Sequence, residues 1–227
     1  MADSPELNAR HAKRLHHTMS AVGGFFAGYI VTAHGVSVLA NAQTMNLIQL
    51  TVALLGRDLG EVLLRVCAFL LYCLGVMGYV WLRDLTRVNL HRASIALDAL
   101  AVVVMLLIPD EADIVVHMLP LFLAMSFQWN AFLGSEVMNS ATVFSTNNTR
   151  QMSMALAEWL MRHDGEKLRK VAFFALTLLM FHVGVSLAWG ATRLWGTAGV
   201  LLALLPLAIA MLQTHNEPRR QPTGNAK

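Results

Sequence analysis

The sequence has few of the residues on which a soluble fold depends. Only 14% of its 227 residues are charged, and it contains six prolines and two cysteines. Hydrophobic residues make up 56% of the chain, and its mean hydropathy is +0.53. Since a soluble domain has about a quarter charged residues, this composition excludes an ordinary soluble domain. It predicts an integral membrane protein whose main partner is the lipid bilayer.

The scarcity of cysteine and the absence of enzyme motifs exclude further classes. Cys67 and Cys73 lie in one apolar segment, too far apart along a helix for a local disulfide, so we expect them to be buried packing residues. The chain has no phosphate-binding loop, nucleophile elbow, zinc-binding helix motif or dinucleotide fingerprint, and no Cys/His spacing typical of a metal site. We therefore expect no cofactor, no metal and no enzymatic activity.

The apolar residues gather in six runs, each close to the roughly 20 residues that a bilayer-crossing helix needs. The runs cover residues 20–40, 61–82, 93–109, 114–133, 170–190 and 195–213. Two shorter segments, 41–56 and 142–161, lie between them. No cleavage site of small residues ends the first run, so we expect an uncleaved span rather than a signal peptide.

Lysine and arginine residues lie between the runs and predict the topology. If neither short segment crosses the membrane, 14 of the 17 Lys and Arg residues lie on one side, which the positive-inside rule assigns to the cytoplasm. Both termini and the loop 83–92 are then cytoplasmic, and the acidic hairpin 110–113 is external. Because topology explains the net charge of +3, we expect no nucleic-acid partner.

Two polar stretches, one in each half, indicate an internal duplication. Thr44-Met45-Asn46 matches Thr146-Asn147-Asn148 at an offset of 102 residues, and Gly60-Glu61 matches Gly165-Glu166 at an offset of 105. Three spans per half is an odd number, so the second half enters the membrane in the opposite direction to the first. The predicted fold is an all-α membrane protein with six transmembrane helices, two short re-entrant or interfacial helices, and two inverted three-span repeats.

The repeats divide one membrane domain into four parts: a cytoplasmic flank 1–19, a first repeat 20–109, a second repeat 110–213 and a cytoplasmic tail 214–227. The histidines of the flank, His11, His16 and His17, are expected to be solvated beside basic residues rather than to bind a metal. The motif Gly24-x-x-x-Gly28 predicts close helix packing, either against a neighbouring span of the same chain or in a homodimer.

Four segments carry a resemblance to a known family. They are Gly23-Gly24-Phe25-Phe26-Ala27-Gly28-Tyr29, Asn41 to Asn46, Phe122 to Asn130, and Val143 to Gln151. Together they resemble the YoaK-like family of uncharacterised bacterial integral membrane proteins, over about residues 18 to 213. Many members read Thr-Gly-Asn where this chain has Met45 and Asn147, so the family's turn must differ here if it needs glycine. The resemblance implies a multi-pass protein of the bacterial cytoplasmic (inner) membrane and implies no activity.

Polar residues beside or inside the apolar runs form the candidate site. Inverted repeats recur in secondary transporters, where polar, irregular backbone between the repeats binds substrate near the midplane. We therefore expect the two polar stretches and an intramembrane amide pair to line one shared cavity. The alternative is that these side chains only join helices by hydrogen bonds. The candidate substrate-binding residues are Asn41, Gln43, Thr44, Asn46, Gln128, Asn130, Thr146, Asn147 and Asn148.

Two ionisable residues inside the spans are candidates for proton coupling. At 1.5 Å per residue, Asp98 lies roughly 9 Å into the membrane and His182 roughly 18 Å. A carboxylate at that depth is costly and therefore a functional candidate. The alternatives are an Asp98 paired with a neighbouring helix or hydrated at the cytoplasmic mouth, and a neutral His182 that packs between helices.

These observations favour a small secondary transporter or channel for an unidentified small solute, with a polar site between two inverted repeats. Two alternatives stay open. One is a non-catalytic membrane assembly or stress protein. The other is a membrane enzyme that uses Asp98 and His182 as acid and base, because such sites need not be contiguous in sequence.

Overall fold

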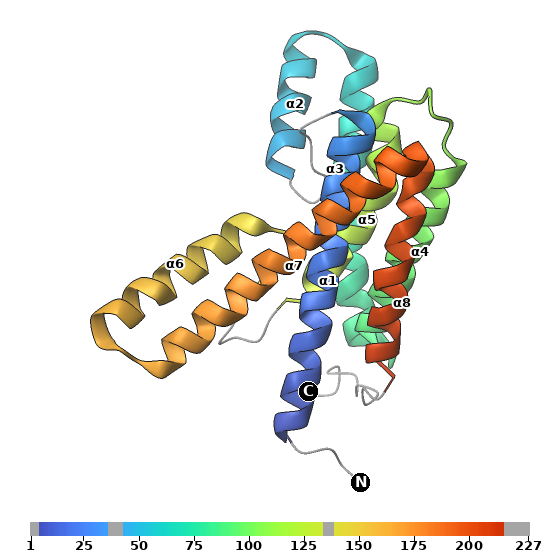
Figure 1. Cartoon of the computed structure of the whole chain (residues 1–227). Coiled ribbons are helices and arrows are strands. Elements are labelled where there is room, and N and C mark those ends of the chain that lie inside the picture. The colour runs from blue at the N-terminus through green and yellow to red at the C-terminus, as the bar shows by residue number, and fades with distance from the viewer. Residues whose placement is uncertain (1–4, 36–42, 134–138, 216–227) are drawn as a thin grey trace.

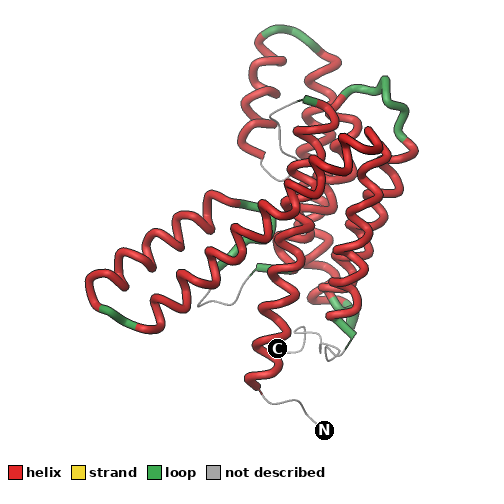
Figure 2. Tube along the Cα trace, in the orientation of Figure 1, coloured by secondary structure: helices red, strands yellow, loops and turns green. Residues whose placement is uncertain are grey.

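The computed structural model describes residues 5–35, 43–133 and 139–215, and within these ranges the chain forms helices and no strand (Figures 1 and 2). The helices are α1 (Pro5–His34), α2 (Gln43–Leu55), α3 (Leu59–Leu85), α4 (Leu90–Leu107), α5 (Ile114–Ala131), α6 (Ser145–Arg162), α7 (Gly165–Trp195), the 3₁₀ helix η1 (Gly196–Ala203) and α8 (Leu204–Gln213). The all-α prediction is therefore confirmed for these residues.

Four helical runs among the described residues are long and apolar enough to cross a membrane: α3, α4, α5 and the continuous run from α7 to α8. Figure 1 shows that α7 and α8 run in opposite directions. Gly196 sits between them with a φ of 59°, a conformation that glycine adopts without strain. Large side chains such as Leu55, Leu85 and Leu107 are more than three-quarters exposed. Such apolar surface belongs in lipid, and the chain is a membrane protein.

The helix borders follow the predicted segments closely in the middle of the chain and less closely at its two ends. α7 extends five residues beyond each end of the predicted span 170–190, and the predicted span 195–213 is divided between η1 and α8. α3, α4 and α5 begin and end within about three residues of the predicted spans, and the two short segments form α2 and α6. α1, however, begins at Pro5, far before the predicted span 20–40. The end of that predicted span, residues 36–40, lies outside the described residues.

The closest helix crossing joins α1 to α7 through glycines. A Cβ at Gly24 would overlap the carbonyl oxygen of Phe181, and one at Gly28 would lie 2.8 Å from the Cα of Val185. From the other side, Gly184 stands against the Ala21 carbonyl. The predicted close packing of this motif is confirmed between two helices of the same chain, because only glycine lets the backbones approach this far.

The remaining helices pack in pairs around this crossing. α3 packs along α5, and α4 packs on both α5 and α8. α8 also packs on α1, while among the described helices α2 contacts only α3 and α6 contacts only α7. In Figure 1, α2 lies beside the start of α3, and the α6–α7 hairpin projects sideways from the bundle.

Hydrogen bonds identify the two ends of the bundle. At one end, the Arg92 guanidinium donates to the carbonyl oxygens of Thr214 and His215, at 2.8 and 3.0 Å, so α4 begins where α8 ends. At the other end, the Tyr29 hydroxyl donates to the Thr197 carbonyl at 2.8 Å. The turn 108–113 lies at this second end, opposite the start of α1 (Figure 1).

Candidate functional site

The first polar stretch belongs to a cluster between α2 and α3. Asn46 is fully buried, and its Nδ2 donates to Gln43 Oε1 at 3.0 Å and to the Arg65 carbonyl at 3.2 Å. The Arg65 guanidinium is itself buried and donates to Glu61 one turn earlier, with a shortest distance of 2.6 Å. Asn46 Oδ1 and Arg65 Nη1 have no partner within the described residues. Thr44 is exposed, and Asn41 lies outside the described residues.

The second polar stretch is centred on Asn148, at the start of α6. Its Nδ2 donates to the carbonyls of Ala141 and Phe144, at 2.7 and 2.8 Å. Its Oδ1 accepts from the Ser140 hydroxyl and the Ala141 amide, at 3.0 and 3.2 Å. This side chain thus holds the segment that precedes α6. Asn147 adds a bond to the Asn139 carbonyl at 3.0 Å.

The same segment is also bonded to α1 and α5. Gln128 is fully buried, and its Nε2 donates to the Met19 carbonyl and to Thr142 Oγ1, both at 3.1 Å. His16 Nε2 lies 2.9 Å from Ser140 Oγ. Of the predicted site residues, the structure therefore brings Gln128, Asn147 and Asn148 together around this segment, apart from Gln43 and Asn46 in the first cluster. It leaves Asn130 with a bond to a carbonyl of its own helix, and Thr146 is exposed.

His16 corrects the expectation of a solvated histidine flank. Its side chain is only 6% exposed and packs against Phe173 of α7, with 5.2 Å between ring centroids. The physical reason is that α1 extends back to Pro5, so this turn of helix lies against α7 and residues 139–144 instead of in solvent.

The two polar stretches do not meet. α2 and α6 make no contact with each other among the described residues, and each stretch has its own hydrogen-bond partners. The described members of the two stretches therefore form two separate clusters. Their bonds match the alternative in which buried amides join neighbouring segments.

Asp98 is the most unusual polar residue of the spans. It is fully buried on α4, and neither of its carboxylate oxygens has a hydrogen-bond partner within the described residues. Ser94, one turn earlier on the same face, is also fully buried with its hydroxyl unpartnered. Buried polar groups are almost always hydrogen-bonded. An unpaired carboxylate at this depth is therefore expected to exchange a proton or a ligand.

His182 lies elsewhere. It is exposed on α7, and its Nδ1 is 2.8 Å from the Leu178 carbonyl of the same helix. Within the described part of the chain, α4 and α7 do not contact each other. The structure therefore does not bring His182 and Asp98 together as an acid and base pair.

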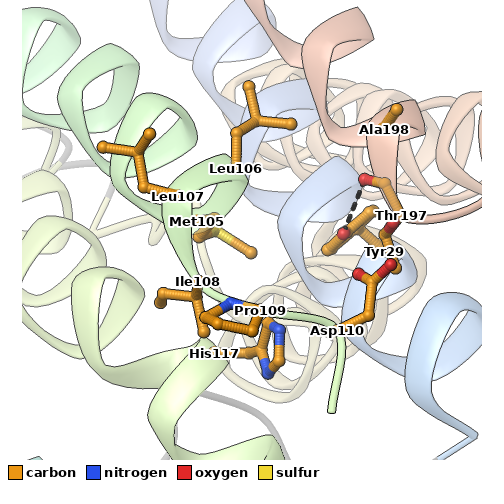
Figure 3. A pocket seen from close by; sticks show the side chains of 10 residues that line it. All are labelled: Tyr29, Met105, Leu106, Leu107, Ile108, Pro109, Asp110, His117, Thr197 and Ala198. Atoms are coloured by element: carbon orange, nitrogen blue, oxygen red, sulfur yellow. Dashed lines mark hydrogen bonds between the residues drawn. The ribbon is translucent and has the colours of Figure 1, made fainter. Parts of the chain in front are cut away.

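A cavity at the second end of the bundle was not predicted. It measures about 370 Å³ and is lined by parts of four segments: α1, the end of α4 with the following turn, α5 and η1 (Figure 3). Its polar lining comes from Tyr29, Asp110, His117 and Thr197. His34 lies next to this group, with its ring 4.8 Å from that of His117.

In the sequence, only the acidic hairpin 110–113 indicated a polar site at this end of the bundle. The other polar residues are single side chains in apolar runs and have no motif spacing, so only tertiary packing brings them together. Within the part of the chain that the structure describes, no group of three or more His, Cys, Asp or Glu residues is arranged to hold a metal ion.

Comparison with known proteins gives a family and no relative of known activity. A family model described as "Protein of unknown function (DUF1275)" matches residues 15–213. Neither the curated proteins nor the solved structures include a match to the chain.

Proposed function

The chain belongs to the DUF1275 family, whose function is unknown, and we propose that this member is a small secondary transporter or channel for an unidentified small solute. The observation that carries the proposal is Asp98, a fully buried carboxylate without a partner on a membrane-spanning helix. In a lipid bilayer, an ionisable side chain without a partner is costly and marks substrate, ion or proton pathways.

The proposed architecture is six spans in two inverted repeats. The spans are α1, α3, α4, α5, α7 and α8. The helix contacts support it. Suppose that α1, α2, α3 and α4 correspond to α5, α6, α7 and α8. The pair α1–α7 then corresponds to α5–α3, the pair α2–α3 to α6–α7, and the pair α4–α5 to α8–α1. All six of these pairs are in contact. His34 at the end of α1 lies against His117 at the start of α5, so these two equivalent helices run in opposite directions. Such repeats are typical of secondary transporters.

The position of Asp98 relative to the cavity supports a path along α4. Asp98 and Met105 are two turns apart on the buried face of α4, roughly 10 Å at 1.5 Å per residue, and Met105 lines the cavity. Ser94 continues this face towards the other end of the bundle. In this proposal, Asp98 binds and releases a proton between the two ends, and the solute enters from the cavity.

The proposed setting follows the sequence. The resemblance to YoaK-like proteins supports a bacterial cytoplasmic membrane, and the positive-inside rule supports a cytoplasmic location for both termini. The bundle end that carries Arg92 would then face the cytoplasm, and the end that carries Asp110 would face outward.

Uptake measured in proteoliposomes tests the proposal. A panel of small amines, amino acids, polyols and sugars is offered under an imposed pH gradient, with the parent protein, Asp98→Asn and Asp58→Asn. The last variant is the control, because Asp58 caps the start of α3 and asparagine caps a helix equally well.

We expect the parent and Asp58→Asn to accumulate one class of solute. Asp98→Asn should lose gradient-driven uptake at least tenfold while its melting temperature is retained. Equal uptake by the parent and Asp98→Asn would contradict the role of Asp98, and no uptake of any solute by the parent would contradict the transport function.

A further inference from the structure

The cavity at the outward end offers hydrogen-bond acceptors. His117 is 3% exposed, and its Nδ1 lies 3.3 Å from the Asp113 carbonyl oxygen. A carbonyl oxygen only accepts, so Nδ1 carries a proton, and Nε2 offers a lone pair whenever the ring is neutral. This Nε2 is buried and has no partner within the described residues.

Two further oxygens add to this acceptor set. The Tyr29 hydroxyl uses its hydrogen on the Thr197 carbonyl, so its oxygen can still accept. Asp110 contributes a carboxylate and its negative charge. Figure 3 shows the Asp110 side chain directed towards Tyr29 and Thr197, with the His117 ring beside Pro109. Among the described residues that line the cavity there is no lysine or arginine.

The rest of the wall is apolar. Met105, Leu106, Leu107, Ile108 and Ala198 line it, together with the ring of Pro109. A volume of about 370 Å³ is at the lower end of the range for small-molecule sites and far larger than a single ion needs. The ligand that fits this wall has an apolar body as well as a polar group.

We propose that this cavity binds a small organic ammonium cation, an amine with a compact alkyl or aryl body. Its N–H groups would donate to the Asp110 carboxylate, to His117 Nε2 and to the Tyr29 oxygen, and its apolar body would lie against the end of α4. An anion is disfavoured by Asp110. This inference deepens the proposed transport function, because it names the class of solute that enters from the outward end.

Equilibrium binding to the purified protein in nanodiscs tests the site. The probe is benzylamine, and its neutral counterpart benzyl alcohol has the same shape without the positive charge. The variants are Asp110→Asn, His117→Phe and, as a control, Glu111→Gln, which removes the neighbouring carboxylate that does not line the cavity. The melting temperature of each variant reports whether it folds.

We expect the parent and Glu111→Gln to bind benzylamine at least tenfold more tightly than benzyl alcohol. Asp110→Asn should remove this preference, and His117→Phe should weaken benzylamine binding severalfold. Should His117→Phe fail to fold, the comparison of Asp110→Asn with Glu111→Gln still decides. Equal binding of the two probes to the parent, or an unchanged preference in a folded Asp110→Asn, would overturn the proposal.

Binding and transport can fail separately. Charge-dependent benzylamine binding without gradient-driven uptake of any amine would keep the site and contradict the transport function. Uptake of another solute that depends on Asp98, without charge-dependent binding of benzylamine, would keep the transport function and overturn the ammonium site.

Discussion

Among single residues, Asn148 makes the densest set of hydrogen bonds in either polar stretch. Asn148→Ala would remove four bonds and leave the Ala141 amide and carbonyl without this partner. At roughly 0.6–1 kcal/mol per bond, we expect a loss of about 2–4 kcal/mol in the free energy of unfolding. Asn130→Ala is the control, because it removes one bond within a helix and should cost about 0.5 kcal/mol. Thermal unfolding of both variants measures the difference, and equal losses would contradict it.

An exposed ion pair gives a prediction about pH. Glu158 of α6 is paired with Lys167 of α7, and the hydrogen bond and positive charge of Lys167 lower the pKa of the Glu158 carboxyl below its ordinary value of 4.5. A carboxyl group whose pKa is lower in the folded state stabilises the fold at pH values above its unfolded pKa. This stabilisation is lost as the pH falls through its folded pKa.

The melting temperature of the parent should therefore fall more steeply than that of Glu158→Gln below about pH 4.5. The effect should be small, because both groups are solvated. Glu166→Gln serves as a control that keeps the ion pair, and identical pH profiles for the parent and Glu158→Gln would show that the pair contributes nothing.

At the scale of elements, the glycines of α7 provide a matched pair. A Cβ at Gly184 would overlap the Ala21 carbonyl of α1, whereas a Cβ at Gly190, less than two turns later, would meet nothing within 4 Å. Gly184→Ala should lower the free energy of unfolding by about 1–3 kcal/mol through overpacking. Gly190→Ala should leave it unchanged or raise it by up to about 1 kcal/mol, because alanine favours the helix. Thermal unfolding compares the two, and a tolerated Gly184→Ala would contradict the tight crossing.

The sequence predicted where the helices begin and end far better than it predicted which segments they contact. Runs of apolar residues located α3, α4 and α5 because lipid selects for composition along the whole span. The extension of α1 to Pro5 was not predicted, because residues 5–15 contain no long apolar run, although most of them are good helix formers. Asn46, Asn148 and Asp98 are buried because a polar side chain that faces lipid is costly.

The partners of these residues could not be predicted. His16 bonds Ser140, and Tyr29 bonds Thr197, across more than a hundred residues of sequence. No local spacing encodes such contacts, because they depend on how α1 lies against helices of the other half. For the same reason the cavity at Asp110 could not be predicted, although the acidic hairpin itself could be identified in the sequence.

For the whole molecule, the topology is the property that everything else depends on. After Cys67 and Cys73 are replaced, single cysteines at positions 87 and 111, both exposed, can be labelled from outside with an impermeant maleimide. We expect strong labelling of Glu111→Cys and none of Arg87→Cys until the membrane is permeabilised. The reverse pattern would contradict the proposed orientation, and equal labelling of both sites would contradict their location at opposite ends of the bundle.

The glycine crossing between α1 and α7 also constrains the order of assembly. Gly24 packs on Phe181, which the ribosome adds about 160 residues later, after roughly ten to thirty seconds at ordinary rates of synthesis. If α1 spans the membrane as proposed, it lacks during that interval the helix that covers its glycine face in the folded protein. The nascent chain therefore has an exposed surface suited to another small-residue helix, and insertion factors that shield such a surface should raise the yield of folded protein.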